Sequence, residues 1–323
     1  MNTISKVLLA AAAFNFFAIA CSKQEGATDE ASSNEQESVV EVAENSETET
    51  STTPSPAEVI EASTAEDWRL LDPENLLYIE LERGTVIVAL STDLAQAHVE
   101  QMKALAREAF YDGLSFYRVI DGFVAQGGDA METREIKTAA KSLTAEFDEP
   151  LRDDISFTEL QDQDGYASSV GFLSSLPVGA DLKEGRIWHL HCTGAMAMAR
   201  GNEKDTGGTE IYFPIQPQRY LDRNLTVFGR VVQGMEHLQM LRRVAPPASE
   251  DDDMGETIIS MKVGADIPEA DREALEILRS DTDTFTAYVE ARRNRPEEFF
   301  YFRPDHIDVC ALNIPVRAVG EGE

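Results

Sequence analysis

The sequence predicts a mainly β protein built around a closed barrel that is capped by helices. Many short runs of β-branched and aromatic residues recur between Leu76 and Ala265, and glycine-rich connections separate them. Two segments of that range, 94–110 and 234–244, instead read as helices. Numerous short strands with few helices are typical of a barrel, because closure removes the exposed edges of a sheet.

The N-terminal residues predict export and lipidation. Residues 1–6 carry one lysine, and residues 7–20 form an apolar run that is too short to span a bilayer comfortably. The run ends in AIA before Cys21, which resembles a bacterial lipobox. We therefore expect residues 1–20 to be a lipoprotein signal peptide and Cys21 to be acylated. An ordinary secretory signal that is cleaved near Ala20 is the alternative.

The residue after Cys21 bears on the compartment. Ser22, where an aspartate would be the retention signal, resembles the sorting pattern of outer-membrane lipoproteins in Gram-negative bacteria. We expect a protein of the Gram-negative cell envelope that is lipid-anchored on the periplasmic face. The outer membrane is favoured over the inner one.

The distribution of acidic residues distinguishes a linker, residues 21–66, from the folded part of the chain that follows it. Residues 21–66 are rich in Ser, Thr and Glu, with Lys23 as their only base, and this composition predicts a disordered linker. The net charge of −31 argues against nucleic acid as a partner. With 323 residues, of which 42% are hydrophobic, the chain can form a core of ordinary size.

The first half of the folded part begins with a hairpin. Residues 76–91 are two β-branched runs around Arg83-Gly84, and Asp93 is expected to cap the helix over 94–110. The stretch DGLSFYRVIDGFVAQGGD (112–129) then predicts two strands around Asp121-Gly122, a dipeptide that favours a type I′ turn.

The second half is less regular at its start. Residues 130–190 are polar and dotted with glycines, so we expect loops with short strands and no independent core, including an insertion at about 150–190. Strands are predicted at 193–200, 209–215, 226–232 and 256–265. After this come two predicted helices, over residues 268–281 and 284–295. The apolar end of the chain is expected to pack back on the barrel.

The cysteines suggest one disulfide. If Cys21 is acylated, Cys192 and Cys310 remain as a pair in an oxidising compartment, and a bridge between them is expected. Two buried free thiols are the alternative. His189 and His191 lie beside Cys192, but no third ligand is evident, so no metal site is predicted. The G-x-S-x-G motif of serine hydrolases is missing from the sequence.

Two blocks carry a family resemblance. FYDGLSFYRVIDGFVAQGGD, residues 110–129, and GTEIYFPIQPQRYLDRNLTVFGRVVQGME, residues 208–236, resemble the signatures of cyclophilin-type peptidyl-prolyl cis-trans isomerases. The resemblance covers residues 76–265 and is similar to a bacterial envelope branch of the family. It implies an eight-stranded antiparallel barrel with a helix at each end, X-Pro isomerisation without a cofactor, and proline-containing polypeptides as partners. The expected domains are 67–265, the isomerase, and 266–323, a helical extension.

The resemblance assigns roles to individual residues. Arg118 matches the catalytic arginine of the family, and Gln126 matches a residue that binds the substrate backbone and orients this arginine. The expected lining of the proline pocket and binding edge consists of Phe123, Val124, Ala199, Arg200, Glu210, Tyr212 and Leu221. A two-residue turn at Asp121-Gly122 would put Gln126 and Arg118 on opposite faces, so a break in pairing near Gln126 is expected.

Several positions depart from the family pattern. Tyr117 replaces a histidine, Glu210 a glutamine, Tyr220 a tryptophan and Leu225 a histidine. The tryptophan position bears on cyclosporin binding in the family. Glu210 is expected to pair with Arg118 or Arg200, which would tune the choice of substrate or weaken catalysis. A weak or inactive module that binds proline peptides as a chaperone or scaffold is therefore the alternative function.

Overall fold

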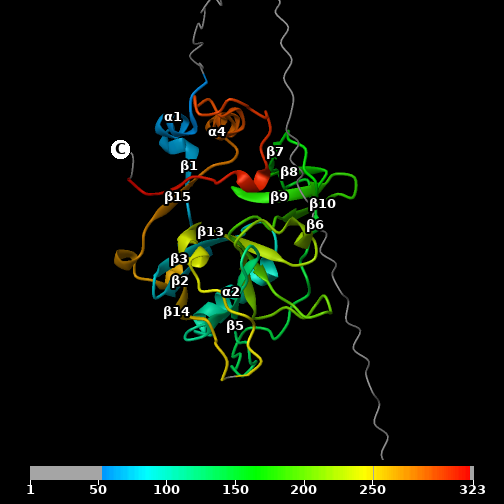
Figure 1. Cartoon of the computed structure of the whole chain (residues 1–323), viewed down its shortest axis with the longest axis vertical. Helices are drawn as coiled ribbons and strands as arrows, with labels where there is room; N and C mark the ends of the chain where they lie inside the picture. Colours follow the sequence, from blue (N-terminus) through cyan, green and yellow to red (C-terminus); the bar gives the residue numbers. More distant parts are fainter. Residues whose placement is uncertain (1–52, 250, 321–323) are drawn as a thin grey trace, which may run out of the picture. The chain divides into compact units, whose positions relative to one another are not determined.

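The predicted barrel is present. The structure, a computed structural model, describes residues 53–249 and 251–320 (Figure 1). Eight antiparallel strands close in the order β11-β12-β5-β4-β14-β2-β3-β13. Their bounds are β2 Leu76–Leu81, β3 Gly84–Leu90, β4 Ser115–Val119, β5 Val124–Gly128, β11 Ala195–Met198, β12 Ile211–Pro214, β13 Val227–Gln233 and β14 Glu256–Val263. Each overlaps a segment that the sequence assigns to a strand, and β13 ends one residue beyond its predicted segment.

Two helices cover the barrel core. α2 (Gln96–Arg107) and α3 (Met235–Gln239) contribute Val99, Met102 and Leu238 to the cluster that fills the barrel. The prediction that Asp93 caps α2 is wrong. The N-cap is Ala95, whose side chain cannot accept a hydrogen bond, and the carboxylates of Glu146 and Glu149 accept from the first amides of the helix instead.

The hairpin between β4 and β5 differs from the predicted two-residue turn. Ile120 donates its amide to the carbonyl of Val124, so the loop holds three residues rather than two. Gly122 has φ +65°, whereas Asp121 is not in the left-handed region, which excludes a type I′ turn. The extra loop residue places Arg118 directly opposite Gln126. The predicted break in pairing near Gln126 is present. It falls between the pairs Ser115–Gly128 and Arg118–Gln126, and the extra residue lies on β4.

The insertion is more ordered than predicted. It forms a five-stranded antiparallel sheet in the order β6-β10-β9-β8-β7. The bounds are β6 Glu149–Pro150, β7 Thr158–Leu160, β8 Ser169–Leu173, β9 Leu176–Asp181 and β10 Arg186–His189. Phe172 and Trp188 of this sheet share one apolar cluster with Phe285 and Tyr288 of the C-terminal extension. The insertion therefore has a core, but it is a core that the end of the chain completes.

The segments before and after the barrel pair with each other. β1 (Trp68–Leu70), β15 (Leu275–Leu278) and β16 (Val316–Ala318) form a sheet in which β15 is central. The predicted helix over 268–281 is thus wrong, because β15 finds two strand partners far away in the sequence. The second predicted helix is present as α4 (Asp283–Asn294). Leu275 and Ile277 pack on Leu76 of the barrel, as the extension was expected to do.

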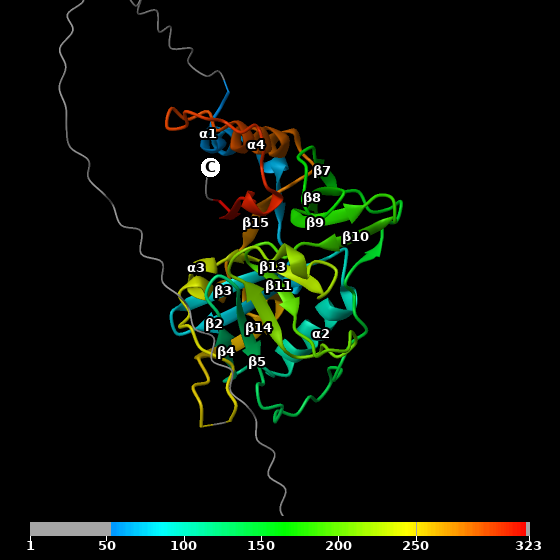
Figure 2. The ribbon, with the colours of Figure 1, turned by 45° about the vertical axis from the view of Figure 1, so that its right-hand side comes forward.

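The end of the acidic linker is ordered. α1 (Pro56–Glu61) begins with a capping box between Ser55 and Glu58, and its Val59 joins the cluster around α4. Figures 1 and 2 show α1 and α4 side by side. The prediction of disorder is therefore wrong for residues 53–66. The signal peptide, Cys21 and the rest of the linker lie outside the described residues.

The predicted disulfide is present and joins two of these parts. Cys192 follows β10 and Cys310 lies in the extension, with their Cα atoms 4.9 Å apart. Both sulfur-bearing residues belong to the cluster that the insertion and extension share. The bridge closes a loop with a sequence separation of 118 residues. In residues 53–249 and 251–320, no helix is long and apolar enough to cross a membrane.

Candidate functional site

One row of residues crosses four strands on the outer face of the barrel. Arg118 of β4 lies opposite Gln126 of β5, Gln126 lies opposite Tyr212 of β12, and Tyr212 lies opposite Ala197 of β11. Directly opposed residues of antiparallel strands share a face. The sequence neighbours Val119, Ala125, Phe213 and Met196 belong to the barrel interior. The row therefore points outward.

Arg118 is held by uncharged groups. Its Nη1 donates to Oε1 of Gln126 at 3.0 Å, and its guanidinium carbon lies 5.3 Å from the centre of the Phe123 ring. Among the described residues, no carboxylate forms an ion pair with Arg118. The side chain is half-buried, so its charge is positioned but not neutralised.

A bulge brings Tyr117 to the same site. Phe116 and Val119 both lie in the barrel interior although they are three residues apart, which breaks the alternation of a regular strand. Tyr117 and Arg118 thereby both reach Gln126. Nε2 of Gln126 donates to the Tyr117 hydroxyl at 2.7 Å, while Oε1 of the same amide accepts from Arg118. The amide of Gln126 is fixed from both sides.

Glu210 completes this chain of hydrogen bonds. The Tyr117 hydroxyl donates to Oε2 of Glu210 at 2.6 Å, and the amide of Asp129 donates to Oε1 at 2.8 Å. Burial raises the pKa of Glu210. Burial and the nearby carboxylate raise the pKa of Tyr117 far above its usual range, so this hydroxyl stays a proton donor. The expectation that Glu210 pairs with Arg118 or Arg200 is wrong.

Gly128 makes room for Glu210. A Cβ on Gly128 would overlap the Glu210 carboxylate, and the φ of +145° is one that residues with side chains rarely adopt. A Cβ on the neighbouring Gly127 would lie 3.0 Å from the Phe116 ring and from the Ser115 carbonyl oxygen. The glycine pair therefore lets the bulge and the acid come together.

Beside the row lies an apolar cluster. Phe123, Ala199, Leu221 and Leu225 are partly buried and pack on a buried set. The buried set is Val124, Ala195, Ala197, Tyr212 and Val227. Five residues that the family resemblance assigns to substrate binding, namely Phe123, Val124, Ala199, Tyr212 and Leu221, thus meet at one place next to Arg118. Their role in binding stays a prediction. Tyr220 is 58% exposed and is not a member of this cluster.

The histidines near Cys192 have structural partners. His191 hydrogen-bonds with the Tyr212 hydroxyl through Nε2 at 2.8 Å and with Asp222 through Nδ1 at 3.0 Å. His189 hydrogen-bonds with Ser91 at 2.8 Å, and burial lowers its pKa to about 4. Within the described part of the chain, no three His, Cys, Asp or Glu residues come together as a metal site.

Arg200 lies on a groove that starts beside Gln126. It donates to the carbonyls of Gly201, Asn202 and Asn224 and packs over Phe147, and it forms no ion pair with an acid among the described residues. The groove has a volume of about 710 Å³. Its walls include Gln126, Ala199, Arg200, Glu210 and the loop residues Arg134, Ile136 and Lys141. An extended chain bound at Arg118 has a path along this groove.

Three contacts of this site were not predicted from the sequence. The Tyr117–Glu210 bond, the Asp129 amide and the support of Tyr212 by His191 all join residues that are distant in sequence. Only the paired departures at Tyr117 and Glu210 signalled one of them. Both residues depart from the family pattern, and their side chains are hydrogen-bonded to each other, so the two departures belong to one contact.

Comparisons with known proteins all find peptidyl-prolyl cis-trans isomerases. The family model described as "Cyclophilin type peptidyl-prolyl cis-trans isomerase/CLD" matches residues 76–263. A probable peptidyl-prolyl cis-trans isomerase of Brucella suis biovar 1 (strain 1330) is 30% identical over 173 residues, which cover 53% of this chain and 74% of the relative. Peptidyl-prolyl cis-trans isomerase B of Bacillus subtilis (strain 168) is 32% identical over 160 residues, which cover 49% and 85%.

A solved structure extends the similarity beyond the barrel. The crystal structure of cyclophilin AquaCyp293 from Hirschia baltica matches with a TM-score of 0.65 and 28% sequence identity. The match covers 78% of this chain and 94% of that protein. This coverage is wider than that of the family model, so parts outside residues 76–263 are also similar.

Proposed function

Because the chain belongs to the cyclophilin-type peptidyl-prolyl cis-trans isomerase family, we propose that it isomerises X-Pro bonds of cell-envelope proteins with the help of Arg118. The enzyme class follows from the family. The clients, the compartment and the role of Arg118 are the proposal. The observation that carries it is the half-buried guanidinium of Arg118, which forms no ion pair within the described part of the chain and lies beside an apolar cluster.

Isomerisation of an X-Pro bond is accelerated by a cation that lies close to the prolyl nitrogen. Resonance in the peptide C–N bond opposes rotation with a barrier of about 18–20 kcal/mol. As the bond twists, the prolyl nitrogen becomes pyramidal and gains a lone pair. A guanidinium aimed at this nitrogen stabilises the twisted state more than the planar states, and only such differential binding accelerates the reaction. Arg118 is suited to this task, since it remains charged and presents a rigid fork of donors.

The surroundings of Arg118 supply orientation. Phe123 and Leu221 offer an apolar surface for the proline ring, next to the buried Tyr212. Gln126 holds the guanidinium, while Tyr117 and Glu210 fix which way the amide of Gln126 points. Preorganised dipoles of this kind need no rearrangement while the bond turns.

The location in the cell envelope rests on different observations. The sequence AIA-Cys21 supports acylation at Cys21, and the Cys192–Cys310 bridge suits an oxidising compartment. We propose that the lipid anchor and the acidic linker hold the barrel at the periplasmic face of the outer membrane. Mass spectrometry of the N-terminal peptide from the envelope fraction tests this: an acylated Cys21 is expected, and an unmodified N-terminus near Ala20 would contradict it.

One experiment separates catalysis from binding alone. In the alternative function, the barrel binds proline-bearing segments without turning them over. A protease-coupled assay or NMR exchange on a short X-Pro peptide, with the purified protein, is expected to show faster exchange than buffer alone. Binding of the peptide without faster exchange would favour the chaperone or scaffold function. Arg118 is bound by the neutral Gln126, and none of the described acids forms an ion pair with it, which supports catalysis.

A further inference from the structure

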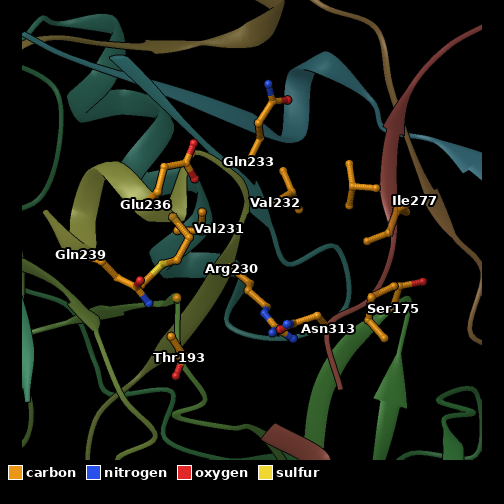
Figure 3. A pocket seen from close by; sticks show the side chains of 15 residues that line it. Ser175, Thr193, Arg230, Val231, Val232, Gln233, Glu236, Gln239, Ile277 and Asn313 are labelled. Carbon is orange, nitrogen blue, oxygen red and sulfur yellow. The ribbon is translucent and has the colours of Figure 1, made fainter. Parts of the chain in front are cut away.

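A second pocket lies between the barrel and the C-terminal extension (Figure 3). Its volume is about 470 Å³, within the range of small-molecule sites. One side comes from β13 and α3, and the other from β15, β16 and the segment before β16. None of its lining residues belongs to the row of Arg118 or to the apolar cluster beside it.

Arg230 of β13 extends into this pocket. It lies between Ala89 and Ala195 on the neighbouring strands, and these small residues leave space for its long side chain. Figure 3 shows the side chain running from β13 toward Asn313 of the extension. Nη1 is buried without a hydrogen-bond partner, and the guanidinium has no ion pair within residues 53–249 and 251–320. Burial lowers the pKa of Arg230 to about 10.

Arg230 is a partly buried cation, and its enclosed Nη1 has no partner among the described residues, which favours a bound anion. Removing a charge from water is costly unless another charge and hydrogen bonds compensate. Buried arginines of globular proteins are accordingly paired as a rule. In the same chain, the buried Arg219 has Asp164 at 2.8 Å and Asp222 at 2.6 Å. The pocket around Arg230 offers the space where such a partner would fit.

The lining narrows the chemistry of the anion. Val232, Met235, Ile277, Ile314 and Val316 present apolar surface, while Ser175, Thr193, Gln233, Gln239 and Asn313 add neutral polar groups. The other charge that faces the pocket is Glu236, whose carboxylate lies toward Gln233 and away from Arg230 in Figure 3. One cation and one acid disfavour a dianion such as phosphate. A guanidinium suits a carboxylate, which it can bind through two parallel hydrogen bonds.

We propose that the Arg230 pocket binds a carboxylate that carries a small aliphatic group. Arg230 holds the carboxylate near Asn313, and the aliphatic group lies against Ile277 and Val316. The same chemistry comes from a free organic acid or from the C-terminus of a polypeptide. This site is separate from the isomerase site, and its occupancy ties the extension to the barrel.

The test uses the purified full chain with isovalerate as probe, in calorimetric titration and thermal unfolding. Isovalerate is expected to bind and to raise Tm, as a ligand of the folded state does. Isovaleramide, phosphate and chloride at equal ionic strength are expected to leave Tm unchanged. A tripeptide ending in valine, with a free or an amidated C-terminus, identifies the source. Tighter binding of the free terminus than of isovalerate indicates a polypeptide, and the reverse indicates a free acid.

Variants locate the site. Arg230→Met is expected to weaken isovalerate binding at least tenfold and to have a Tm without ligand that equals or exceeds that of the wild type, since an unpaired charge is gone. Arg152→Met, which removes a charge from an exposed ion pair, is the matched control and should bind as the wild type does. Asn313→Leu retains Arg230 and is expected to weaken binding severalfold. Equal Tm shifts with isovaleramide, or unchanged binding in both pocket variants, would overturn the proposal.

Discussion

The hydroxyl of Tyr117 links Gln126 to Glu210 by hydrogen bonds, and its removal tests whether these bonds orient Gln126 toward Arg118. Tyr117→Phe keeps the ring, which is 7% exposed, but deletes the group that links Gln126 to Glu210. Nε2 of Gln126 and Oε2 of Glu210 each lose a partner. The amide of Gln126 is then no longer held in the orientation that presents Oε1 to Arg118.

The magnitude follows from the two bonds. A hydrogen bond to a charged group contributes roughly 1.5–3 kcal/mol and one between neutral groups about 1 kcal/mol. Part of this is recovered by water, because Gln126 and Glu210 are only half-buried. We expect the free energy of unfolding to fall by about 1–3 kcal/mol. A loss of about 1–2 kcal/mol in transition-state stabilisation corresponds to a decrease of roughly 5- to 30-fold in kcat/KM.

The assay is a double-mutant cycle with Glu210→Gln. kcat/KM on an X-Pro peptide and urea unfolding are measured for both single variants and the double variant. Because the two side chains share one hydrogen bond, the effects should deviate from additivity by about 1 kcal/mol. Tyr301→Phe, at a fully exposed tyrosine, is the control. Additive effects, or a kcat/KM of Tyr117→Phe equal to that of the wild type, would refute the idea that this chain of bonds orients Gln126.

Three further predictions concern other parts of the fold. In urea unfolding, Gly128→Ala should lose at least about 1 kcal/mol more stability than Gly113→Ala. Both glycines have positive φ, but a Cβ at Gly113 meets nothing within 4 Å, whereas one at Gly128 overlaps the Glu210 carboxylate. Equal losses would contradict this overlap. Reduction of the Cys192–Cys310 bridge should lower the unfolding free energy by about 3–5 kcal/mol, and an unchanged Tm in reductant would contradict this. The unfolded chain protonates His189 below pH 6.5, whereas the folded chain protonates it only near pH 4, so the free energy of unfolding falls as the pH drops through this window. His189→Asn should remove about 3 kcal/mol of that fall in urea unfolding at different pH values. An equal pH dependence in the variant and the wild type would contradict this.

Prediction from sequence succeeded where the signal is local. The barrel strands are short alternating runs between glycines, and all eight lie where the pattern places them. Arg118 and Gln126 sit eight residues apart in one hairpin, so a contiguous motif could identify both. The structure adds that they touch.

Prediction failed where distant segments decide the structure. The composition of residues 268–281 favours a helix, but residues 275–278 form a strand because they pair with β1 and β16. The insertion was expected to hold loops with short strands, but its strands form one five-stranded sheet, and Phe172 of this sheet packs with Phe285 of α4. The partner of Glu210 depends on a bulge in β4, whereas the residue spacing predicted a break in pairing near Gln126 without showing which side chains it brings together.

In the proposed mechanism, the charge of Arg118 accelerates rotation because it stabilises the twisted X-Pro bond. The most direct measurement is kcat/KM of Arg118→Ala and Arg118→Lys on an X-Pro peptide, together with peptide affinity and urea unfolding. Arg83→Ala, at an ion-paired surface arginine, serves as control. We predict that Arg118→Ala loses most of its kcat/KM while it still folds, and that Arg118→Lys recovers only a fraction of it. Wild-type kcat/KM in a folded Arg118→Ala variant would contradict the account.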